Sequence, residues 1–181
     1  APFTLHKQMK AHIEKVGAAA AAGQPARIVV KGNALTDVPL IEALVRAGQA
    51  GAETDLVVRG ACMLPPGIPG LTERIRVRSI VGRFLEHSRI AYFRWGEGAD
   101  DEALFLSSAD WMGRNMFGRI EVAWPVRDPA LRQRVIDECL VPYLRDRRDA
   151  WSLHADGRYS RAGTEGPSAQ QALLDLYSAR A

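Results

Sequence analysis

The spacing of apolar residues along the chain predicts alternating helices and strands. Residues 4–22 carry apolar side chains at helical intervals and predict an amphipathic helix, with its buried face at Leu5, Met9, Ile13 and Val16. Gly23 and Pro25 then end the pattern. The chain begins with Ala-Pro-Phe and no methionine, so we expect residues 1–22 to lead in from a preceding domain of a longer protein.

A strand, a helix and a second strand follow in close succession. Residues 26–31 form a short apolar run, residues 38–49 have helical spacing, and residues 53–59 form a second apolar run. Thr36 or Asp37 can cap the helix. This order is typical of a βαβ unit, in which two parallel strands are joined by a right-handed crossover.

The second half of the chain predicts a stiff loop over residues 61–73, then shorter strands and two further helices. Residues 88–95 alternate in polarity, and residues 102–106 can pair back on them as a hairpin. The remaining expected elements are a strand at 119–125, a long helix at 128–144 kinked or ended near Pro142, a hairpin from 151–154 and 158–161, and a terminal helix at 168–181. The fold class predicted by these elements is α/β.

Composition and charge narrow the classes of function only slightly. A chain of 181 residues with 47% hydrophobic and 25% charged residues is a typical globular domain with its own core. A net charge of +3 does not by itself indicate a nucleic-acid partner, and no apolar run is long enough to span a membrane. Cys62 and Cys139 lie too far apart in sequence for a metal-ligand motif, and we expect a reduced, cytoplasmic protein.

The candidate chemistry gathers in residues 74–89, where one histidine, His87, stands among the arginines Arg74, Arg76, Arg78, Arg83 and Arg89. The planar guanidinium binds phosphate oxygens in a bidentate grip, and histidine titrates near neutral pH. The stretch therefore predicts phosphoryl chemistry. An alternative stays open: Arg76-Val77-Arg78 fits the solvated face of an edge strand, and the chain prefers arginine to lysine throughout.

More polar groups follow the strands of the predicted βαβ unit. Lys31 and Asn33 end its first strand and Arg59 ends the second, so these groups should share the rim on which ligands of α/β sheets bind. Residues 107–115 follow another strand with hydroxyl and amide groups, which suit either an oxyanion or a helix cap. The other histidines, His6, His12 and His154, have no polar cluster beside them in sequence and are interpreted as surface residues.

Four stretches together resemble the C-terminal catalytic domain of bacterial polyphosphate kinase, a family related in fold to phospholipase D. They are Asp55–Gly60, Gly67–Gly70, Ile75–Ile90 and Ser107–Trp111. The resemblance implies a phospholipase-D-like domain with a mixed β-sheet flanked by helices over residues 23–162, followed by a linker and helix over 163–181.

The resemblance also implies an activity: reversible transfer of the ATP γ-phosphoryl group to inorganic polyphosphate, with Mg²⁺, through a phosphohistidine in a preceding domain. His87 would be the acid/base partner, and Arg59 and His87 would contact nucleotide and phosphates. Further phosphate contacts are expected from Arg89, Arg83, Arg78, Lys31 and Asn33, with the Mg²⁺ ligands mainly outside this chain. The implied setting is a homo-oligomeric enzyme with no nucleic-acid partner, in the cytoplasm or on a membrane through its other parts.

Three positions depart from the family pattern. Gly32 stands where methionine is usual, Pro65 replaces an arginine, and Gly118 occupies a position that is commonly basic. The loss of two positive groups would weaken the grip on a polyanion. Two alternatives therefore stay open: a domain that only binds polyphosphate or nucleotide, and a phospholipase-D-like phosphodiesterase in which two chains each supply one His87.

Overall fold

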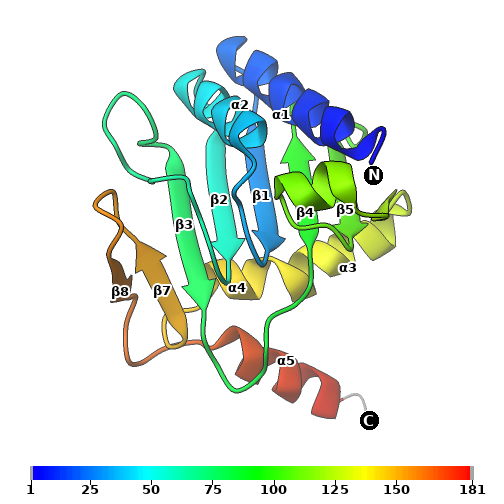
Figure 1. Cartoon of the computed structure of the whole chain (residues 1–181). Helices are drawn as coiled ribbons and strands as arrows, with labels where there is room; N and C mark the ends of the chain where they lie inside the picture. The colour runs from blue at the N-terminus through cyan, green and yellow to red at the C-terminus, as the bar shows by residue number, and fades with distance from the viewer. Residues whose placement is uncertain (1, 180–181) are drawn as a thin grey trace.

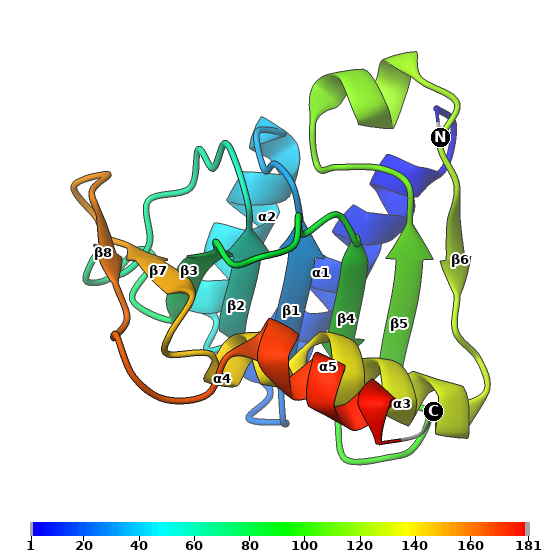
Figure 2. The ribbon, with the colours of Figure 1, turned by 90° about the horizontal axis from the view of Figure 1, so that it is seen from below.

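The computed structural model describes residues 2–179, which form one eight-stranded mixed sheet with helices on both faces (Figures 1 and 2). The strand order is β6-β5-β4-β1-β2-β3-β7-β8. The strands are β1 (Arg27–Gly32), β2 (Glu53–Val58), β3 (Ile75–Ile80), β4 (Ile90–Arg94), β5 (Glu102–Ser107), β6 (Ala123–Pro125), β7 (Ala150–Leu153) and β8 (Tyr159–Arg161).

The predicted βαβ unit forms the centre of the sheet. β1 and β2 pair in parallel, with α2 (Val38–Gln49) between them in sequence, and β3 extends the parallel set on the other side of β2. Asp37 caps α2, because its carboxylate accepts a hydrogen bond from the amide of Leu40 at 3.1 Å. Both flanks of this parallel core are antiparallel, and the hairpins predicted for residues 88–106 and 151–161 are confirmed.

Helices α1 (Leu5–Ala21) and α2 pack side by side on one face of the sheet (Figure 1). The predicted stripe of α1, from Leu5 to Val16, is buried in the main hydrophobic core. Burial of each such aliphatic side chain contributes about 1.5–3 kcal/mol. At Gly17 a Cβ atom would lie 3.3 Å from the Cα of Ala47, so glycine permits the close approach of the two helices.

The opposite face is covered by α3 (Pro129–Cys139), α4 (Val141–Arg145) and α5 (Ala169–Ser178) (Figure 2). The helix predicted over residues 128–144 is broken at Leu140, whose backbone leaves the helical region, two residues before Pro142. Proline has no amide hydrogen to donate and favours such an interruption. Leu131, expected on the buried face, is 55% exposed.

Other differences follow from local pairing. The strand predicted over 119–125 is reduced to β6, and a π-helical turn occupies Arg114–Gly118. The last two residues of the predicted terminal helix lie outside the described part of the chain. No helix within residues 2–179 is long and apolar enough to cross a membrane.

The division into residues 1–22, 23–162 and 163–181 stays a prediction. α1 shares the main core with α2 and the sheet, and Ala169 of α5 packs with Val57 and Ile80. The described residues of all three parts therefore contribute to the packing around one sheet.

Candidate functional site

The connection between β3 and β4 crosses the carboxyl ends of the central strands. β3 and β4 are separated in the sheet by β2 and β1, so residues 81–89, which join them, must pass the ends of both (Figure 1). His87 lies on this crossing, and Arg59 directly follows β2. The topology thus brings together residues that are 28 positions apart.

Arg59 and His87 are in contact at this rim. Arg59 Nη1 donates to the backbone oxygen of Glu86 at 2.5 Å and lies 3.3 Å from His87 Nδ1. A guanidinium has only donors, so Nδ1 acts as the acceptor, and a neutral His87 carries its proton on Nε2. His87 is exposed and Arg59 half-buried, which leaves the imidazole open to a ligand.

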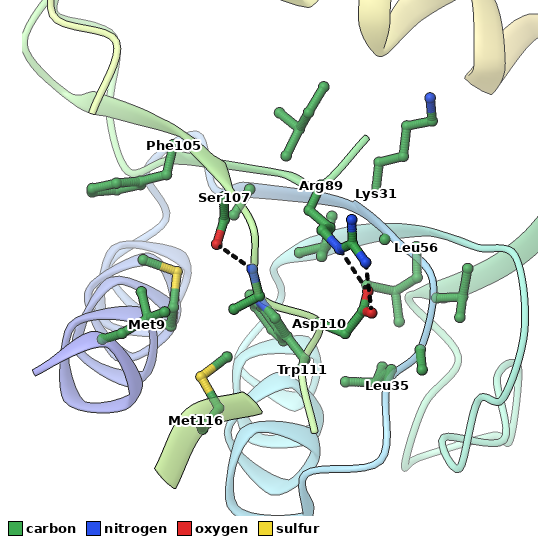
Figure 3. Close-up of a pocket in the computed structure, with 18 residues that line it drawn as sticks. Met9, Lys31, Leu35, Leu56, Arg89, Phe105, Ser107, Asp110, Trp111 and Met116 are labelled. Atoms are coloured by element: carbon green, nitrogen blue, oxygen red, sulfur yellow. Dashed lines mark hydrogen bonds and ion pairs between the residues drawn. The ribbon is translucent and has the colours of Figure 1, made fainter. Parts of the chain in front are cut away.

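Arg89 pairs with one buried carboxylate, that of Asp110 (Figure 3), and Asn33 contacts the same carboxylate. Arg89 donates to this carboxylate through Nε at 3.2 Å and through Nη2 at 3.1 Å. The backbone amide of Asn33 donates to it at 2.7 Å. Burial raises the pKa of Asp110, but these hydrogen bonds outweigh it and hold the pKa below its usual value. Arg89 also donates to the backbone oxygen of His87 at 2.9 Å, so the pair fixes the histidine's main chain.

Lys31 does not face the rim, although the sequence placed it there. Its ammonium is buried and donates to Glu86 Oε2 at 2.7 Å and to Ser88 Oγ at 2.8 Å, and it lies 3.5 Å from the ring centroid of Tyr143. Burial lowers the pKa of Lys31, opposed by its bond to Glu86. In this arrangement Lys31 supports the crossing segment from the side of α4 and has no free donor directed at a phosphate on the rim.

The arginines of residues 74–89 do not form one cluster. Arg74 and Arg76 lie at the amino end of β3 and pair with Glu53 and Asp55, so the interpretation that places them around His87 is wrong. The edge-strand alternative is also wrong, because β3 lies between β2 and β7.

The two remaining arginines, Arg78 and Arg83, differ in exposure and in hydrogen bonding. Arg78 is half-buried, and its Nη1 donates to the backbone oxygens of Leu144 at 2.6 Å and Tyr143 at 3.3 Å, near the end of α4. Arg83 is exposed and lies 5.3 Å from the ring centroid of Phe84. Arg83 is therefore the more accessible of the two to a phosphate.

Residues 107–115 contribute through Asp110 rather than through hydroxyl groups. Ser108 and Asn115 both bond to Glu121, which ties them to the turn before β6. The sequence pattern does not identify Asp110, Glu86 or Gln170 as residues of the site. No local signal marks such residues, because their partners lie 55 and 84 positions away.

The other histidines have varied environments. His6 lies 3.0 Å from Asp37 Oδ1, and His12 is stacked on Phe93 with centroids 5.2 Å apart, so the surface interpretation is wrong for both. Burial, followed by the charge of Lys15, lowers the pKa of His12. His154 is exposed, as expected, and bonds to Ser160.

A cavity beneath the Arg89–Asp110 pair is too small for a nucleotide. Its volume is about 20 Å³, and its walls are mainly apolar, including Met9, Leu35, Phe105 and Met116 (Figure 3). That volume corresponds to about one water molecule. The accessible side chains of the rim, Arg59, His87 and Arg83, lie outside this cavity.

The carboxylates of the rim do not form a magnesium site. Asp110 is neutralised by Arg89, and Glu86 by Lys31. Within residues 2–179 no three histidine, cysteine or acidic side chains gather as metal ligands. The described carboxylates of the rim therefore do not fit a resident Mg²⁺.

Comparisons with known proteins find relatives that match nearly the whole chain. A polyphosphate kinase from Burkholderia cenocepacia is 53% identical over 175 residues, which cover 97% of this chain and 25% of the relative. The structure of polyphosphate kinase from Porphyromonas gingivalis gives a TM-score of 0.91 at 37% identity, over 99% of this chain and 28% of that one. The chain thus spans about a quarter of the length of the relatives it matches.

A more distant likeness concerns the fold alone. NucT from Helicobacter pylori gives a TM-score of 0.50 at 12% identity, over 75% of this chain and 89% of that one. The predicted fold class, an α/β, phospholipase-D-like domain with a mixed sheet flanked by helices, is confirmed. The family described as "Polyphosphate kinase C-terminal domain 2" matches residues 1–172, and the chain belongs to this family.

Proposed function

We propose that this chain supplies one part of a composite active site that reversibly transfers the γ-phosphoryl group of ATP to inorganic polyphosphate. The observation that carries the proposal is the contact of Arg59 with His87 on an open rim, together with the family membership of the chain. Phosphoryl transfer depends chiefly on positioning and on neutralising the charge of the phosphate oxygens. A fixed guanidinium beside an exposed imidazole suits that task.

His87 is proposed as the acid/base partner. With Nδ1 facing Arg59, its Nε2–H is available to donate to a phosphate oxygen or to hand over a proton. The phosphorylated histidine is proposed to lie in another domain of the longer enzyme. Arg59 and Arg83 would contact phosphate oxygens, while Arg89 would hold the main chain of His87 from below.

The remaining properties are proposals at the level of the whole enzyme. We propose that Mg²⁺ arrives with the nucleotide and is held mainly by phosphate oxygens, water and groups outside this chain. A homo-oligomeric enzyme in the cytoplasm, with a membrane contact through other domains, is proposed on family grounds. Arg78, Lys31 and Asn33 would support the site indirectly, because the side chains of Arg78 and Lys31 and the backbone amide of Asn33 donate to other groups of this chain.

The test compares three proteins: the full-length protein, its His87→Ala variant, and residues 1–181 alone. We expect polyphosphate formation from ATP and Mg²⁺ only in the unaltered full-length protein. A full-length protein that binds polyphosphate in a salt-dependent way without turnover would favour the binding-only alternative. Phosphodiesterase activity in a dimer of residues 1–181 would favour the hydrolase alternative.

A further inference from the structure

The segment that carries His87 has little backbone pairing of its own. Backbone hydrogen bonds tie residues 81–89 at their two ends, from the Val81 amide to Asp149 and from the Ser107 amide to the carbonyl of Arg89. Between Gly82 and Ser88 no backbone-to-backbone hydrogen bond forms with any described residue. The position of His87 therefore depends on side chains that reach this segment from elsewhere in the fold.

Gln170, in the first turn of α5, makes three of these contacts. Its Oε1 accepts from the amide of Phe84 at 2.9 Å, and its Nε2 donates to the carbonyl of Phe84 at 2.7 Å and to Glu86 Oε1 at 2.7 Å. The side-chain amide thus pairs with both backbone groups of one residue, as a neighbouring strand would. Only 6% of Gln170 is exposed.

Gly82 lacks a side chain at the place where the amide of Gln170 packs. A Cβ atom at position 82 would lie 2.5 Å from Oε1 and 2.9 Å from Cδ of Gln170. Any larger residue would push the amide of Gln170 away from Phe84. The glycine and the glutamine therefore fit one another across 88 positions of sequence.

Gln170 is itself held in place by the start of α5. Ser168 donates to Asp149 Oδ2 at 2.6 Å, and the amide of Ala169 donates to Asp146 Oδ2 at 2.7 Å. These bonds fix the first turn of the helix against residues 146–149. Figures 1 and 2 both show α5 beside the connection from β3 to β4.

The contact continues from Gln170 to the proposed acid/base residue. One carboxylate oxygen of Glu86 accepts a hydrogen bond from Gln170 and the other accepts one from Lys31. The backbone oxygen of Glu86 accepts a hydrogen bond from Arg59. His87 is the next residue. Three elements, α5, β1 and the end of β2, thus converge on the residue before His87.

We propose that Gln170 is a positioning residue that latches residues 82–87 to α5 and so sets the orientation of His87 for phosphoryl transfer. The catalytic part of this inference rests on the proposed function, whereas the latch itself does not. A displacement of about 1 Å in a reacting group can cost roughly 100-fold in rate. Loss of the latch should therefore act on kcat, because Gln170 does not reach the rim where substrate binds.

The test uses three variants in the full-length protein. Gln170→Ala removes all three hydrogen bonds, Gln170→Glu keeps the volume but removes both donors, and Gly82→Ala displaces the amide without altering it. Gln171→Ala is the matched control, because Gln171 is exposed on the same helix and its side chain donates a hydrogen bond to Asp175, four residues later on that helix. Hydrogen–deuterium exchange of the peptide covering residues 81–89 and steady-state kinetics are measured for each.

We expect faster exchange at residues 81–89, a kcat reduced by about tenfold or more, and a KM for ATP within about twofold in all three variants, with no change in the control. Unchanged exchange in that peptide would overturn the latch. Faster exchange with unaltered kcat would overturn the positioning role, as would exchange that rises throughout the domain in all three variants. If His87→Ala retains turnover, the proposed function fails, while the exchange result still decides the latch.

Discussion

Two groups of arginines within residues 59–89 have the same chemistry and opposite environments. At the amino end of β3, Arg74 and Arg76 are paired with Glu53 and Asp55. At the carboxyl rim, Arg59 contacts a histidine, and the carboxylate below it is already satisfied by Arg89. A six-residue strand separates the two groups by about 20 Å.

The difference shows that local density of positive charge does not define a phosphate site. At the amino end each guanidinium meets a carboxylate, so the net field available to an anion is small. At the rim Asp110 is buried, and Asp110 and Glu86 are both paired, while Arg83 and His87 are exposed and Arg59 is half-buried. Carboxylates are paired at both ends, but Arg59 and Arg83 form no ion pair with a described carboxylate. We therefore expect a polyanion to bind at the rim rather than at the amino end.

The largest expected effect is on His87. We expect His87→Ala in the full-length protein to lower kcat by about 10²–10⁴-fold, because a positioned acid/base group contributes about that much. The unfolding transition should be unaltered, since the side chain is exposed. Turnover equal to that of the unaltered protein would contradict the assigned role.

The next effect concerns Arg59. Arg59→Lys keeps a positive charge but loses the planar fork that reaches both Glu86 and His87. We expect a fall in kcat/KM of about 10²-fold, in the range found when one charge-stabilising donor is removed. Arg74→Lys is the matched control at the amino end of β3, and an equal loss there would remove the distinction between the two groups.

A stability effect is expected at the pair beneath the rim. Asp110→Ala leaves Arg89 without its buried partner and should destabilise the domain by about 3–5 kcal/mol, measured by chemical denaturation. Because the folded pKa of Asp110 is lowered, its contribution is present above about pH 4 and is lost as the pH falls through that lowered value. Asp110→Asn should flatten this acid dependence, and a profile that keeps its slope would contradict the assignment.

The smallest effect is expected at Arg76. Its side chain is 52% exposed, so the ion pairs with Glu53 and Asp55 are screened by solvent and are each worth at most about 1 kcal/mol. Asp55 also keeps Arg27 as a partner. We expect Arg76→Gln to change turnover by less than twofold and the free energy of unfolding only slightly, whereas a tenfold loss of turnover would place Arg76 in the site after all.

The periodic parts of the chain could be predicted because they depend on neighbours in sequence. The stripe of α1, the βαβ unit and both antiparallel hairpins follow from apolar spacing and turn residues. The break at Leu140 was foreseen through Pro142, because proline acts locally. The short length of β6 was not, since edge pairing with β5 decides how far that strand extends.

The candidate site was likewise only partly predictable from neighbours in sequence. The sequence by itself determined the family resemblance, the residue types of the site, and the expectation that residues following parallel strands share a rim. Only the tertiary structure decided which residues meet: it placed Lys31 against Glu86, Arg78 against the end of α4, and Gln170 against Phe84. The physical reason is that a side chain with a buried partner cannot serve a ligand at the same time, and such partners are chosen by the sheet order and helix docking rather than by neighbours in sequence.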